Sequence, residues 1–174
     1  MEETLERELV RARGTDTCLS VVMLDLDNFK SMNDLYGHAV GDTVLRAVAA
    51  LLGRGLRASD IACRFGGEEL IVILPDCPPE GAAMRAEAIR ISLEAMQVVE
   101  LGQSFKVTAS FGVASTALCG HDQSALLKAA DLALYTAKRT GRNRVESWRP
   151  IAVKQPFDLG STENLKTHAV VERT

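Results

Sequence analysis

Two short apolar runs on either side of a glycine pair constrain this chain more than any other feature. The first run, the turn and the second run are Ile61–Phe65, Gly66-Gly67-Glu68-Glu69 and Leu70–Leu74. Glycine readily adopts the positive φ angles of a tight turn, so the pattern predicts a β-hairpin. The hairpin therefore delivers two carboxylates beside its turn.

The other apolar patterns alternate between the periods of strands and helices. Strands are expected at Leu19–Leu26, at about Lys106–Ala114 and from Val145. Helical segments are expected at Thr4–Ala12 (ended by Gly14), Asn28–Leu35, Val44–Leu52, Ala82–Met96 and Leu126–Ala137. The order βαββαβ, with a hairpin inside it, predicts an α/β (α+β) fold with a ferredoxin-like core and helices on one face of the sheet.

Length and charge limit the classes of function. The 174 residues suit one domain, which we expect over residues 1–148, followed by an extended tail at 149–174. A net charge of −3 gives no broad positive field, so no nucleic-acid partner is expected, although a small anionic ligand fits. No apolar run approaches the roughly 20 residues of a membrane span, which predicts a cytoplasmic segment without membrane contact.

Four acids are expected beside strand ends, where ligand groups gather in α/β sheets. They are Asp25, Asp27, Glu68 and Glu69. Mg²⁺ takes one or two such carboxylates and completes its octahedron with waters and substrate phosphates. The alternative is that surface turns are rich in acids without binding anything.

The segment Arg64-Phe65-Gly66-Gly67-Glu68-Glu69-Leu70 resembles the signature of GGDEF-domain diguanylate cyclases in its G-G-E-E form, with Leu70 in place of the usual phenylalanine. Other stretches resemble further motifs of that family: Asp25-Leu26-Asp27-Asn28-Phe29-Lys30, Asn33-Asp34, Gly37-His38, Gly41-Asp42, Ser110-Phe111-Gly112-Val113-Ala114 and Tyr135–Asn143. The resemblance runs from about Leu19 to Trp148. It implies a fold like that of nucleotidyl cyclases and polymerase palms.

The resemblance also implies roles for individual residues. The catalytic acids would be Asp25, Glu68 and Glu69, and the metal ligands would be Asp25, Glu68 and the backbone carbonyl of Leu26. Guanine would be bound by Asn33 and Asp42, whose acceptors suit its N1 and N2 donors. The triphosphate would be bound by Lys30, Lys138 and Arg142. The remaining GTP-site positions would be Gly66, Gly67 and Phe29, the last expected mainly to pack.

Each of these roles has a simpler alternative. Asn33 and Asp42 could cap helices. The three cations could be solvated charges, although Lys138 and Arg142, four residues apart, share one face if their helix continues that far. The glycine pair could serve the hairpin alone.

The activity implied is condensation of two GTP molecules into cyclic di-GMP with Mg²⁺, or Mn²⁺, in a head-to-head homodimer. Arg57 and Asp60 resemble the family's R-x-x-D product-inhibition site; a further helix arginine is expected near position 88, which is Ala88 between Arg85 and Arg90. The family's N-terminal motif is absent, which predicts a longer protein with an upstream sensor or receiver domain and leaves a membrane anchor there open. The alternatives are a catalytically inactive domain that binds GTP or cyclic di-GMP, and a cyclase making a single-nucleotide product.

Overall fold

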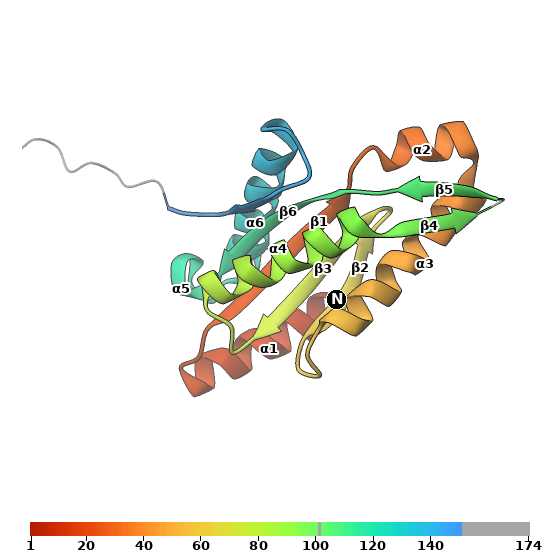
Figure 1. The fold of residues 1–174 in the computed structure, drawn as a ribbon. Helices are drawn as coiled ribbons and strands as arrows, with labels where there is room; N and C mark the ends of the chain where they lie inside the picture. Colours follow the sequence, from red (N-terminus) through yellow and green to blue (C-terminus); the bar gives the residue numbers. More distant parts are fainter. Residues whose placement is uncertain (101, 151–174) are drawn as a thin grey trace, which may run out of the picture.

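The computed structural model describes residues 1–100 and 102–150 (Figure 1). The helices are α1 Glu2–Thr15, α2 Phe29–Tyr36, α3 His38–Gly55, α4 Pro79–Ala95, α5 Thr116–Cys119 and α6 Gln123–Arg139. The strands are β1 Leu19–Leu26, β2 Ile61–Gly66, β3 Glu69–Pro75, β4 Gln97–Glu100, β5 Gln103–Lys106, β6 Ala109–Ser115 and β7 Val145–Ser147. The predicted tail lies almost wholly outside the described residues, so the boundary after residue 148 stays a prediction.

The central sheet has the strand order β2-β3-β1-β6-β7. All neighbouring strands are antiparallel except β6 and β7, which are parallel. The middle strand, β1, is paired along its length with β3 on one side and β6 on the other, and all eight of its residues are buried. The predicted βαββαβ core is therefore confirmed, with β7 added at one edge.

Helices cover both faces of this sheet, and the prediction of one covered face is wrong. The face with Val22 and Leu24 packs against apolar residues of α3 and α4. The opposite face, with Val21 and Met23, packs against α1 and α6. The run Leu19–Leu26 is apolar at nearly every position because both faces of β1 are buried.

Several element boundaries also differ from the predictions. Helix α1 passes through Gly14 and ends where Asp16 adopts a left-handed φ of 52°. Helix α3 begins directly after Gly37, well before Val44. The strand expected from Lys106 instead begins at Ala109, and a separate two-stranded sheet of β4 and β5 precedes it. Within the described residues no helix has the length and apolar character needed to span a membrane.

Candidate active site

Asp25 lies near the end of the central strand, on the face covered by α6. It is opposite Glu69 of β3 and Ser110 of β6 in the sheet register. Its side chain is almost buried, and Lys138 at the end of α6 lies with its Nζ 2.8 Å from Asp25 Oδ2. The fold therefore brings the first-strand acid, the hairpin acid and a helix-end cation to one end of the sheet.

Burial and neighbouring carboxylates raise the pKa of Asp25 and of Glu69 at this end of the sheet. Burial raises the pKa of Asp25, and the charges of Glu68 and Asp27 raise it further, against the opposing effect of Lys138. Burial also raises the pKa of Glu69, with Asp25 contributing next. Such concentrated negative charge favours a cation.

The hairpin turn is shaped by its glycines and by an arginine that was not singled out from the sequence. Strand β2 ends at Gly66, β3 begins at Glu69, and Gly67 has a φ of +44° that suits glycine. Arg64 Nε donates a 2.8 Å hydrogen bond to the Gly67 carbonyl oxygen. The register shifts between Arg64 and Gly66, as in a β-bulge, and Glu68 lies in the turn that follows.

The donor set at this end of the sheet fits a magnesium ion held jointly with a substrate. Within residues 1–100 and 102–150, no group of three His, Cys, Asp or Glu side chains is arranged to hold a metal. Mg²⁺ does not need such a cage, because it binds one or two carboxylates and fills its remaining positions with phosphates and water. Asp25 and Glu68 are close enough for the charge of Glu68 to raise the pKa of Asp25, and with the Leu26 carbonyl they would make up such a partial set.

Asp27 is not free to join this set, which corrects the grouping of four acids. Its Oδ1 accepts a 2.7 Å hydrogen bond from Ser110 Oγ, and its Oδ2 accepts one of 2.7 Å from Thr108 Oγ1. Oδ2 also accepts from the backbone N–H of Asn143, at 3.1 Å. The Asp27 carboxylate therefore links the end of β1 to the start of β6 and to the loop after α6.

Asn33 presents an unpaired acceptor. Its Oδ1 is buried and finds no hydrogen-bond partner within the described part of the chain. The amide lies against Gly41 of α3, where a Cβ would collide with Oδ1 and approach Phe29 Cζ to 3.1 Å. Glycine inside a helix is unfavourable by itself, so this close approach accounts for Gly41, a residue whose role the sequence did not reveal.

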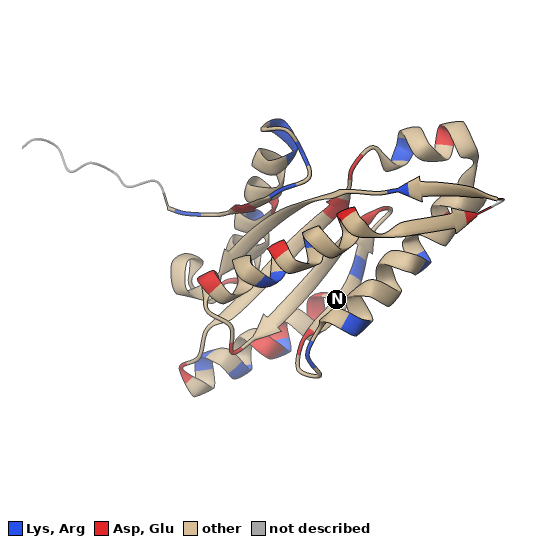
Figure 2. Ribbon diagram, viewed as in Figure 1, with Lys and Arg blue, Asp and Glu red and all other residues tan. Residues whose placement is uncertain are grey.

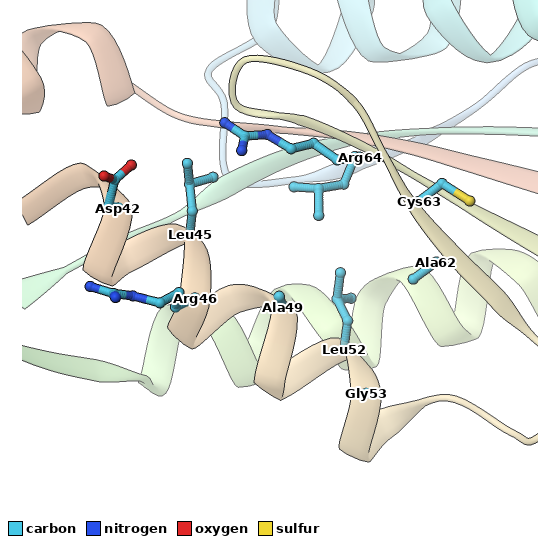
Figure 3. A pocket seen from close by; sticks show the side chains of 10 residues that line it. Asp42, Leu45, Arg46, Ala49, Leu52, Gly53, Ala62, Cys63 and Arg64 are labelled. Carbon is cyan, nitrogen blue, oxygen red and sulfur yellow. The ribbon is translucent and has the colours of Figure 1, made fainter. Parts of the chain in front are cut away.

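A groove of about 670 Å³ runs between α3 and β2 (Figure 3). Asp42 and Arg46 of α3 lie on one wall, and Arg64 extends across the groove toward the end occupied by Asp42. Leu70 also lines the groove. The exposed Asp42 carboxylate thus stands at the mouth of a cavity beside the hairpin.

The structure decides some of the simpler alternatives. Asn33 lies inside α2 and Asp42 inside α3, while the capping positions are Asn28 and Gly37, so neither predicted guanine ligand is a helix cap. Phe29 is buried in the core beneath them, as expected.

The three predicted phosphate cations lie in different surroundings. Lys138 is paired with Asp25, whereas Lys30 and Arg142 are exposed. Helix α6 ends at Arg139, so it does not continue far enough for Lys138 and Arg142 to share a helical face. Figure 2 shows cations gathered at this end of α6 and in the following loop.

Arg57 and Asp60 lie together before β2. Asp60 Oδ2 accepts a 2.9 Å hydrogen bond from the Arg57 backbone N–H and a 2.5 Å one from Arg85 Nη1. The Asp60 side chain is only 1% exposed. Arg85 of α4 therefore contacts Asp60 from a position three residues before Ala88, on the same face of the helix.

The chain matches known proteins over most of its length. The model of the family described as "Diguanylate cyclase, GGDEF domain" matches residues 1–144. Diguanylate cyclase A of Treponema denticola is 43% identical over 127 residues, which are 73% of this chain and 34% of that protein. The response regulator PleD of Caulobacter vibrioides is 44% identical over 129 residues, which are 73% of this chain and 28% of that protein. This chain spans about a third of the length of these curated relatives.

Solved structures agree with these sequence matches. The GGDEF domain of DgcB from Caulobacter crescentus, solved in complex with c-di-GMP, superposes with a TM-score of 0.78 and 33% identity, covering 84% of this chain and 86% of that one. The active GGEEF domain of a diguanylate cyclase from Vibrio cholerae superposes with a TM-score of 0.79 and 34% identity, covering 85% and 94%. With the hairpin, its paired acids and the sheet order already in place, the chain belongs to the GGDEF-domain diguanylate cyclase family.

Proposed function

We propose that this chain is a diguanylate cyclase that condenses two GTP molecules into cyclic di-GMP and pyrophosphate. The observation that carries the proposal is the position of Asp25 at the end of β1, between Lys138 and the acids of the hairpin. This arrangement provides carboxylates for a divalent cation and an ammonium group for phosphate at one point. Transfer of a nucleotidyl group chiefly requires such positioning and charge neutralisation.

Asp25, Glu68 and the Leu26 carbonyl would hold Mg²⁺, with Mn²⁺ as an alternative. When bound, the metal supplies charge neutralisation on the phosphates and lowers the pKa of the attacking hydroxyl. Lys138 would move from Asp25 to a phosphate oxygen as the cation takes its place. Lys30 and Arg142 would contact the outer phosphates.

Guanine would be selected over adenine by two hydrogen-bond acceptors, one from α2 and one from α3. Asn33 Oδ1, which is buried without a partner among the described residues, would accept from the guanine N2 amine. The Asp42 carboxylate, at the mouth of the groove, would accept from N1. Adenine lacks both donors, so GTP is the expected substrate.

The reaction would proceed twice for each product. The 3′-oxygen of one GTP bonds to the α-phosphorus of the other, the bond to pyrophosphate breaks, and the hydroxyl proton leaves. Glu69, whose pKa is raised by burial, is the candidate acceptor of that proton. Each domain offers one set of base and phosphate contacts, so two domains would meet head to head with two-fold symmetry. We place this reaction in the cytoplasm, where GTP is supplied.

Arg57, Asp60 and Arg85 would form a product-binding site that limits turnover. Arginine can contact a phosphate or a guanine edge through two parallel hydrogen bonds. The buried pair between Asp60 and Arg85 would open as the product arrives. An upstream sensor or receiver domain in a longer protein would control how the two catalytic domains meet.

The test is to incubate the product-free protein with GTP and Mg²⁺ and to separate the nucleotides by chromatography. We expect cyclic di-GMP from the wild type and none from Glu68→Gln, because the neutral amide weakens metal binding. Glu80→Gln, on an exposed surface of α4, is the matched control and should keep full activity. A wild type that binds GTP but makes no cyclic di-GMP, even with two copies tethered, would show an inactive binding domain instead.

A further inference from the structure

The loop after α6 is clamped by the side chain of Asn143. Asn143 Oδ1 accepts a 2.9 Å hydrogen bond from Arg90 Nη1, and its Nδ2 donates a 2.8 Å bond to Glu94 Oε1. Arg90 and Glu94 are themselves paired on α4 at 2.8 Å. Both ends of the amide are thus satisfied by a charged pair on another helix, and charged partners make stronger hydrogen bonds than neutral ones.

The same loop is fastened to the central sheet through Asp27. The Asn143 backbone N–H donates to Asp27 Oδ2, and the hydroxyls of Thr108 and Ser110 hold that carboxylate in place. These three hydrogen bonds, 2.7 to 3.1 Å long, fix the orientation of the Asp27 carboxylate. Asn143 therefore connects β1, α4 and the loop at one point.

The backbone at this point is held in a conformation that side chains other than glycine seldom adopt. Arg142 has a φ of 60° and Asn143 a φ of 45°, both left-handed. Asparagine tolerates this region, but arginine gains nothing from it. Such a conformation persists only when surrounding contacts enforce it, and such strain is concentrated at functional sites. Here the Arg142 backbone N–H donates to the Ala137 carbonyl oxygen at 3.0 Å, and the contacts of Asn143 hold the next residue, so the backbone is fixed on both sides of the Arg142 side chain.

We infer that Asn143, held by Arg90, Glu94 and Asp27, is a positioning residue that directs Arg142 toward the phosphates of bound GTP. The inference rests on the proposed function, since it takes Arg142 as a phosphate contact. It also explains Arg90, which lies beside the position expected for a product-binding arginine but bonds the Asn143 side chain instead. Among its bonds, those to Glu87 stay within α4, and the one to Asn143 reaches the loop.

The experiment compares the affinities of two probes that cannot react. 3′-Deoxy-GTP lacks the attacking hydroxyl, and 3′-deoxyguanosine lacks the phosphates as well; both are titrated calorimetrically with Mg²⁺. Asn143→Gly keeps the left-handed backbone accessible and removes only the side-chain clamp. We expect it to weaken binding of the triphosphate about tenfold, as for one lost charged hydrogen bond, and to leave nucleoside binding within about twofold.

A double-mutant cycle tests whether the effect passes through Arg142. Arg142→Ala should weaken triphosphate binding by a similar factor, and Asn143→Gly should add little to it, because both changes remove one interaction. Arg90→Met, which breaks the clamp from α4, should act in the same direction. The matched control is Asp16→Gly, another left-handed residue, at the end of α1, which should leave both affinities unchanged.

The outcomes separate this inference from the function on which it rests. Equal weakening of both probes by Asn143→Gly would show a merely structural residue and overturn the inference. If Arg142→Ala loses the higher affinity for 3′-deoxy-GTP over 3′-deoxyguanosine but Asn143→Gly keeps it, the inference is overturned. The phosphate role of Arg142 would then still stand. A wild type with no preference for the triphosphate would overturn the phosphate role of Arg142 and the inference with it.

Discussion

At the residue scale, one buried oxygen of the candidate site has no hydrogen-bond donor beside it among the described residues. Asn33 Oδ1 is buried and unpaired among the described residues. Leaving such an acceptor unsatisfied costs about 1–3 kcal/mol, which a donor on the ligand would recover. Gly41 allows the amide to lie in this position because it has no Cβ to exclude it.

Replacing Gly41 with alanine should therefore impair recognition of the base. The new Cβ would displace the Asn33 amide, so we expect the preference for GTP over ITP, which lacks the N2 amine, to fall about fivefold to tenfold, the size of one hydrogen bond of about 1 kcal/mol. The measurement is the ratio of kcat/KM for the two nucleotides. Gly14→Ala in α1 is the control, because its Cβ would meet nothing within 4 Å and the residue does not line the groove. An unchanged ratio in Gly41→Ala would exclude Asn33 from base recognition.

The sequence pattern identifies the acids at this end of the sheet, but it does not show which side chains each acid contacts. Asp25 and Asp27 are two residues apart and predict the same chemistry, yet one faces Lys138 and the other is bonded to three donors. Those donors come from positions more than 80 residues later in the chain. No local pattern records such contacts, so only the structure shows that Asp27 is bonded to three donors while Asp25 is paired with Lys138.

At the scale of the elements, α4 carries two arginines with different tasks. Arg85 lies one turn before Ala88 and reaches Asp60, whereas Arg90 bonds Glu87, Glu94 and Asn143. The hydrogen bonds that Arg90 donates to Glu87, and next the one to Glu94, raise its pKa, so it stays charged. The spacing of five residues places the two arginines on different sides of the helix.

Removing Arg85 should affect both stability and inhibition. Arg85→Ala leaves the buried Asp60 carboxylate without its cation, and we expect a loss of about 3 kcal/mol in the free energy of unfolding. We also expect a higher cyclic di-GMP concentration at half-inhibition. Denaturant unfolding and an inhibition curve measure the two effects. Arg149→Ala, at an exposed position after β7, should change neither. If the inhibition curve of Arg85→Ala matched that of the wild type, the pair would be structural only.

The elements with strong apolar patterns were predictable, and the weak ones were not. Strand β1 and the β2–β3 hairpin agree with the sequence patterns almost residue for residue. Strands β4 and β5 have four residues each, with only Val98 and Phe105 buried between them, so no alternation was long enough to detect. Their turn is marked only by Gly102, with a φ of +75°.

At the scale of the whole molecule, one domain holds half of the proposed reaction. Under the proposed function, the guanine acceptors and the cations of the described residues would serve one GTP, so the second GTP would be bound by another copy. The activity of each protomer should then depend on protein concentration.

We expect the specific activity to fall on dilution, with the rate becoming second order in protein when most chains are monomers. Initial rates across a dilution series at saturating GTP measure this. Two copies joined by a flexible linker should keep their specific activity at low concentration, because the linker fixes their effective concentration. Constant specific activity of the unlinked chain would contradict a dimeric reaction centre.

The place of β1 in the middle of the sheet has a consequence for hydrogen exchange. A strand bonded along both edges exposes its amides only when the domain opens as a whole, whereas a short surface helix such as α2 opens locally at lower free energy. We therefore expect slow amide exchange in β1, which carries Asp25, and faster exchange in α2, which carries Asn33. Local opening of α2 would break the contact between Asn33 and the base while Asp25 and the phosphate contacts stay in place. A bound nucleotide would therefore begin to dissociate from its guanine end.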